Sequence, residues 1–121
     1  MVSGDNEEPK KDNIMISFDE FTILYNAAKG EPEFEICFMN QKNTYMIIKY
    51  DDHVSFQRCG VDDRSGEYDY PSLELLYKTE SVDGIRLMDK WDSIETIIAD
   101  GTYDLSIPEE LDSFKAFRDI H

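Results

Sequence analysis

The residues best suited to metal or acid–base chemistry lie together at Asp51, Asp52 and His53. Carboxylate and imidazole groups are ordinary ligands of divalent cations. These three residues are adjacent on a predicted tight turn, where neighbouring side chains diverge. His121, the only other histidine, is the last residue of the sequence. We therefore predict no metal and no cofactor, while a small metal-binding protein or metal-dependent enzyme stays open as an alternative.

A second group of oxygen-bearing side chains lies in residues 60–70, which we predict to form a polar loop. Carboxylates beside a glycine could hold calcium, but the spacing of an EF-hand loop is not met. Tyrosine next to carboxylates is also typical of protein-binding surfaces, because it supplies rigid contact area with a polar tip. The predicted partner-binding residues are Asp62, Asp63, Glu67, Tyr68 and Asp69.

The sequence contains none of the common catalytic motifs. It has no phosphate-binding glycine loop, no nucleophile elbow, no zinc-protease helix and no Cys-x-x-Cys pair. Cys37 and Cys59 are the only cysteines, and we expect both to be packed in a sheet. A carboxylate pair formed only in space stays open, although with 27 acidic residues a chance pair carries little information. We predict no catalytic residue and favour a protein that is not an enzyme.

The charge of the chain restricts its partners. Twelve basic and 27 acidic residues give a net charge of −15, and residues 61–121 hold 16 of the acids but six of the bases. Such a field repels phosphate backbones and anionic membranes, so we expect no direct contact with nucleic acid or membrane. It attracts basic proteins. Acidity also keeps a small protein soluble without any further role, and that interpretation stays open.

The organisation along the chain indicates one domain. Residues 1–13 are polar and predict a flexible tail, and residues 14–121 predict a single α+β domain. No apolar stretch approaches the roughly 20 residues of a membrane span, and the first residues lack the apolar centre of a signal peptide. We therefore expect a cytoplasmic protein with reduced thiols. The oligomeric state is left open.

The first half of the domain has the clearest local patterns. Ser17 and Glu20 have the spacing of a capping box, and the following apolar residues recur with a helical period up to a predicted C-terminal cap at Gly30. Alternation and short links then predict an antiparallel meander. Its strands are Glu33–Met39, Thr44–Tyr50 and Val54–Cys59.

The second half predicts shorter elements. A helix follows Pro71 and Ser72, a second short helical face ends near Ile94, and residues 96–98 predict a strand. Ser106 and Glu109 repeat the capping-box spacing before a last helix. The predicted fold is α+β: an N-terminal helix, a three-stranded antiparallel meander, short helices, a further strand and a C-terminal helix packed on one face of the sheet.

Residues 70–95 combine an apolar-periodic helix, an Asp-Gly turn and a Leu-x-x-x-Trp helix after the meander. The residues of this pattern are Leu73, Leu76, Asp83, Gly84, Leu87 and Trp91. The segment, about a fifth of the chain, resembles small proteins of unknown function carried by phages and mobile elements of Gram-positive bacteria. The resemblance implies a phage or mobile-element accessory protein, a class that includes inhibitors of host defence systems. It implies no catalytic residues.

These observations favour a non-enzymatic, acidic protein that binds another protein. We expect an inhibitor or immunity-type factor that covers a basic surface of its partner, with the acidic segment 60–70 as the contact. A structural or assembly protein that associates with itself is a third possibility.

Overall fold

The computed structural model describes residues 16–60 and 67–120, and its first element is the helix α1 (Phe18–Ala27). The predicted capping box is confirmed, because Ser17 Oγ accepts from Glu20 N at 3.1 Å and Glu20 Oε1 accepts from Ser17 N at 2.9 Å. The predicted C-terminal cap is wrong, because Ala28 caps the helix in an extended conformation. Gly30, with φ of 78°, instead turns the chain towards the sheet.

The predicted meander is confirmed as β2 (Glu33–Phe38), β3 (Thr44–Lys49) and β4 (Val54–Arg58). Its strands are antiparallel, with Ile36 opposite Tyr45 and Ile47 opposite Phe56. The loop predicted for residues 60–70 is wrong over its last four residues, which form β5 (Glu67–Tyr70) beside β4. A strand forms there because β4 offers unpaired backbone groups, and an added strand satisfies them.

The second half of the chain returns to the opposite edge of the meander. The strand predicted at residues 96–98 is confirmed as β6 (Ile94–Ala99), which pairs with β2. With β7 (Tyr103–Asp104) at its edge, the sheet has the order β5-β4-β3-β2-β6-β7. The remaining elements are α2 (Leu73–Lys78), η3 (Val82–Gly84), α3 (Leu87–Lys90), η4 (Trp91–Ser93) and α4 (Pro108–Phe117).

The capping box predicted at the start of α4 is wrong. Ile107 is the residue before the helix, and no side chain caps it. Ser106 Oγ instead donates to Asp104 Oδ1 at 2.6 Å, and Glu110 Oε1 accepts from Asp104 N at 2.8 Å. The Ser106 hydroxyl thus binds Asp104 in the turn after β7 and does not cap α4. Pro108 in the first turn is tolerated there, because the first amides of a helix have no partner within it.

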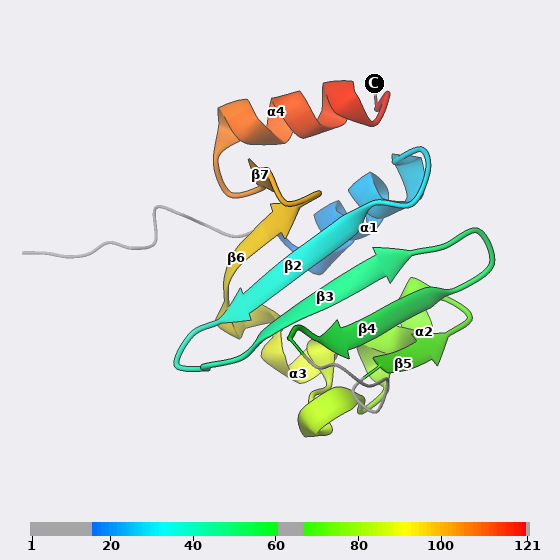
Figure 1. Ribbon diagram of the computed structural model, residues 1–121, viewed down its shortest axis with the longest axis vertical. Helices are drawn as coiled ribbons and strands as arrows, with labels where there is room; N and C mark the ends of the chain where they lie inside the picture. The colour runs from blue at the N-terminus through cyan, green and yellow to red at the C-terminus, as the bar shows by residue number, and fades with distance from the viewer. Residues whose placement is uncertain (1–15, 61–66, 121) are drawn as a thin grey trace, which may run out of the picture.

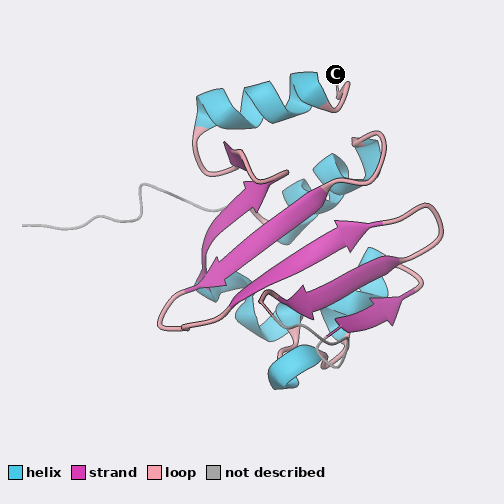
Figure 2. Ribbon diagram, viewed as in Figure 1, coloured by secondary structure: helices cyan, strands magenta, loops and turns pink. Residues whose placement is uncertain are grey.

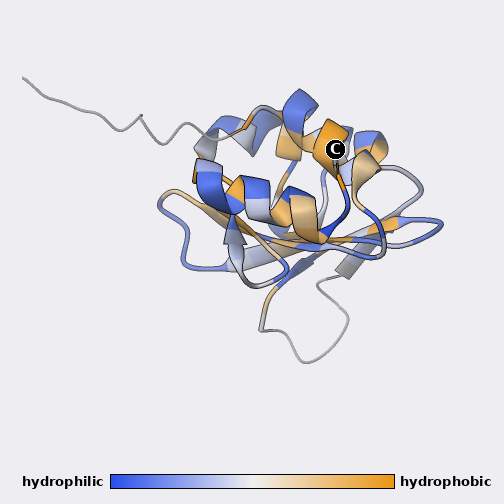
Figure 3. Ribbon diagram, turned by 90° about the horizontal axis from the view of Figure 1, so that it is seen from above, coloured by the Kyte–Doolittle hydropathy of each residue, from blue (hydrophilic) through white to orange (hydrophobic). Residues whose placement is uncertain are grey.

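The described elements form two layers, which confirms the predicted α+β class. The sheet is one layer, and α1, α2 and α3 lie behind it in the view of Figures 1 and 2. Seen from above, α4 lies on the same side as the other helices (Figure 3). The core between the layers is rich in aromatic residues. Its fully buried members include Phe21, Phe34, Tyr45, Phe56 and Phe114.

No helix in the described parts of the chain combines the length and the apolar character that crossing a membrane requires.

Candidate functional site

The two faces of the sheet differ because side chains alternate along each strand. On β2, Phe34, Ile36 and Phe38 are buried beneath the helices, whereas Glu33 and Cys37 lie on the other side. Within residues 16–60 and 67–120, all helices lie on the first side (Figure 3). We call the second side the open face. By register it contains Glu33, Glu35, Cys37, Thr44, Met46, Ile48, Ser55, Gln57, Asp69, Thr96, Ile98 and Asp104.

The open face is anionic. Four carboxylates lie on it, contributed by β2, β5 and β7, and no Lys or Arg of the described strands does. The two cationic strand residues both lie on the helical side. Lys49 donates to Tyr25 O at 2.8 Å, and Arg58 lies 2.6 Å from Asp83. The open face therefore has negative charge with no neighbouring cation of its own sheet to offset it.

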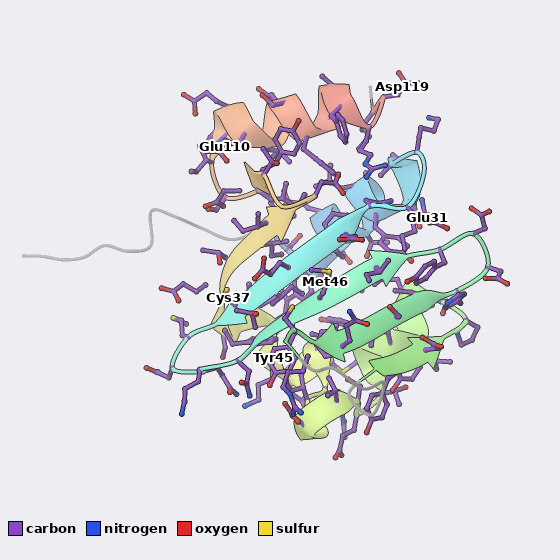
Figure 4. All side chains as sticks on the ribbon, viewed as in Figure 1. Glu31, Cys37, Tyr45, Met46, Glu110 and Asp119 are labelled. Atoms are coloured by element: carbon purple, nitrogen blue, oxygen red, sulfur yellow. The ribbon has the colours of Figure 1, made fainter. Side chains whose placement is uncertain are left out.

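Apolar side chains flank Glu35 on the open face. Met46 and Ile98 are half-buried, and both are register partners of Glu35, from the two sides of β2. Ile48 is buried beside Ser55. Figure 4 shows Met46 and Cys37 on the side of the sheet turned to the viewer, with α1, α2 and α3 behind. Apolar side chains interspersed with carboxylates suit a surface that contacts another protein.

The two cysteines lie on either side of Thr44. Cys37 is opposite Thr44 in β2, and Cys59 N donates to Thr44 O at 2.9 Å from the end of β4. Neighbouring strands lie about 4.8 Å apart, so residues two strands apart are too distant for a disulfide bond. Both thiols are free and half-buried, and burial raises the pKa of Cys59. A raised pKa disfavours the nucleophilic thiolate, so Cys59 is suited to packing.

The structure separates the predicted binding residues. Asp62 and Asp63 lie outside the described residues, and Glu67 is the first residue of β5, paired with Gln57. Tyr68 is opposite Phe56 on the helical side of β5 and is exposed at the edge, whereas Asp69 is opposite Ser55 on the open face. Tyr68 and Asp69 thus belong to different surfaces. Asp69 shares its face with Glu33 and Glu35, which the sequence analysis did not select.

The turn considered for metal binding, residues 51–53, contains a close contact between Asp52 and His53. His53 Nδ1 lies 2.6 Å from Asp52 Oδ1, and the His53 ring stacks on Tyr50 with 4.5 Å between centroids. The hydrogen bond with His53 lowers the pKa of Asp52. Among the described residues, no group of three or more His, Cys, Asp or Glu side chains converges as a metal site requires. The pair therefore orders the turn.

Lys49 is the described side chain most like a catalytic amine. It lines two clefts of 510 and 280 Å³ near the end of α1, and burial, followed by nearby Lys29 and Arg118, lowers its pKa. Its ammonium group donates to Tyr25 O at 2.8 Å and to Ala28 O at 2.9 Å. Because α1 has no basic residue in its last turn, Lys49 supplies the cation that favours the end of this helix. These contacts give Lys49 a structural role at the end of α1.

A scan of protein-family models, a search of curated proteins and a search of solved structures each find no match to this chain.

Proposed function

We propose that this protein is a non-catalytic binding factor that covers a basic surface of a protein partner with its open face, as an inhibitor or immunity-type protein does. The supporting observation is that Glu33, Glu35 and Asp69 lie on one sheet face that no described helix covers and that has no cation from the described strands. A basic partner would gain attraction over the whole face, and like charge would exclude acidic competitors.

Apolar side chains also contribute to this surface, beside its charge. Met46 and Ile98 are half-buried, and a partner that covered them would remove apolar area from water. Hydrogen bonds between the strands hold this face, so little conformational entropy is lost when it binds. The carboxylates then guide the encounter, while Met46 and Ile98 supply apolar contact. The resemblance of residues 70–95 to phage and mobile-element proteins agrees with an inhibitor role.

The test compares two variants that each lose three negative charges. The first is Glu33→Gln with Glu35→Gln and Asp69→Asn on the open face. The second, a matched control, is Asp92→Asn with Glu109→Gln and Asp112→Asn, all exposed and outside the sheet. Each tagged protein is incubated with lysate of its source cells, washed at rising salt, and the bound proteins are identified by mass spectrometry.

We expect one basic protein to be retained by the wild type and the control, lost from the open-face variant, and released as salt rises. Equal retention by both variants would contradict the proposal, because net charge alone would then explain the binding. A retained partner that is acidic or neutral would contradict it as well.

A further inference from the structure

An apolar groove lies between α1 and α4 on the helical side of the sheet. It has a volume of 240 Å³. Its walls come from two segments that are far apart in sequence. The lining residues that matter here are Ile16, Glu20, Ile23, Leu111, Lys115 and Ile120.

Ile23 is not used by the core. The buried side of α1 consists of Phe21, Leu24 and Tyr25, whereas the Ile23 side chain is 67% exposed, more than any other large apolar side chain described. A β-branched residue is also a poor choice for an exposed helix position on propensity grounds. An exposed isoleucine beside an apolar groove indicates a contact surface.

The lining of the groove contains one acid and one base. Glu20 lies on the α1 wall and Lys115 on the α4 wall. Lys115 forms no ion pair with any residue that the structure describes. A protein of net charge −15 repels its own copies over most of its surface, and the open face is one such region. Contacts between Glu20 and Lys115 of two copies would offset part of that repulsion at the groove.

We infer that this groove is the interface of a symmetric dimer, with a second copy of the chain as its occupant. A two-fold axis makes each contact twice, so Lys115 of either copy would meet Glu20 of the other while Ile23 enters the opposite groove. A strongly basic partner fits less well, because it would bring like charge to Lys115. In this dimer both open faces point outward, so one dimer presents two copies of the proposed binding surface.

The first test measures the mass of the wild-type protein by analytical ultracentrifugation over a series of rising concentrations. We expect a reversible dimer. Ile23→Glu should make the protein monomeric over the whole series, and it should fold because this side chain is exposed. Met88→Glu is the matched control, since Met88 is 44% exposed on α3, outside the groove, and this variant should dimerise like the wild type.

The second test exchanges the charges. Lys115→Glu alone places acids opposite acids, and Glu20→Lys alone places bases opposite bases, so each should weaken dimerisation by about tenfold or more. An equimolar mixture of the two variants makes both contacts attractive again and should form a heterodimer. Glu20→Lys also removes the acceptor for Ser17 N, so circular dichroism must first show that its helices are retained.

A wild type that is monomeric throughout, or a mixture that associates no better than its components, would overturn the inference. So would a wild-type dimer that Ile23→Glu leaves intact. Loss of a lysate partner on Ile23→Glu, with a monomeric wild type, would assign the groove to that partner instead. The open-face variant should dimerise normally, so failure of this inference and failure of the proposed function are distinguishable.

Discussion

Arg118 and Asp100 form a two-pronged ion pair, with 2.9 Å from Nε to Oδ2 and 2.8 Å from Nη2 to Oδ1. The third guanidinium nitrogen, Nη1, donates to Lys29 O at 2.9 Å. Asp100 in turn accepts from Glu33 N at 3.1 Å. The end of α4 is thereby tied to the end of α1, the start of β2 and the turn after β6.

Replacing Arg118 with alanine should lower the free energy of unfolding by about 2–3 kcal/mol. The Asp100 carboxylate is 13% exposed and would be left without its cation, so it would keep most of its desolvation cost. Arg118→Lys should recover part of the loss, because an ammonium group keeps the charge but not the planar fork. Urea denaturation of the purified variants measures both values.

Lys78→Ala is the control for this comparison. Lys78 pairs with Glu74 at 3.0 Å on the surface of α2, one helical turn away. An exposed pair of this kind contributes about 0.5 kcal/mol or less. Equal losses from Arg118→Ala and Lys78→Ala would contradict the structural role assigned to Arg118.

The elements that could be predicted from sequence are those that local patterns determine. Ser17 and Glu20 satisfy the first amides of α1 within four residues of chain, and the alternation from Glu33 onwards needs no distant partner. The strand β5 was missed because its pairing depends on β4, while its acids and nearby glycines indicated a loop. The capping box predicted for α4 was wrong because the Ser106 hydroxyl binds Asp104. Sequence spacing alone cannot show that Ser106 prefers this contact to capping the helix.

The open face could likewise be predicted only as far as local patterns determine it. Alternation in β2 already placed Glu33, Glu35 and Cys37 on one face, which could have indicated an acidic sheet surface. Which face the helices cover depends on tertiary packing, so the acidic segment 60–70 was selected instead. Of Tyr68 and Asp69, the predicted residues whose side chains the structure describes, Asp69 lies on the open face by its observed register.

Replacing Ser55 with alanine should leave the free energy of unfolding unchanged or raise it by up to about 1 kcal/mol. Ser55 is fully buried, and its Oγ has no hydrogen-bond partner among the described residues. Removing the hydroxyl therefore removes a desolvated group without breaking a bond. Thermal and urea unfolding of the variant measure the change.

Ser81→Ala is the matched comparison. Ser81 is also buried, but its Oγ donates to Ile85 O at 3.0 Å. Its loss should cost about 1 kcal/mol, because the bond disappears. A larger loss from Ser55→Ala than from Ser81→Ala would show that the Ser55 hydroxyl has a partner in solution.

The Asp83 carboxylate should contribute stability that depends on pH. It accepts from Tyr45 Oη at 2.7 Å and from Arg58 Nη1 at 2.6 Å, which ties η3 to the sheet. The hydrogen bond from Tyr45, helped by Arg58 and opposed by burial, lowers the pKa of Asp83 from 3.8. A lowered pKa in the folded state means that this stability is present above pH 3.8 and is lost as pH falls through the lowered value.

Asp83→Asn should therefore destabilise the protein by about 1–2 kcal/mol near neutral pH, and its difference from the wild type should shrink as pH falls below about 4. Asparagine keeps the positive φ of 56° at this position at little cost, so the comparison isolates the charge. Urea unfolding at several pH values measures the difference. Asp92→Asn, an exposed change outside this network, should differ little from the wild type at any pH. A difference for Asp83→Asn that stays constant down to about pH 3 would contradict the assigned interaction.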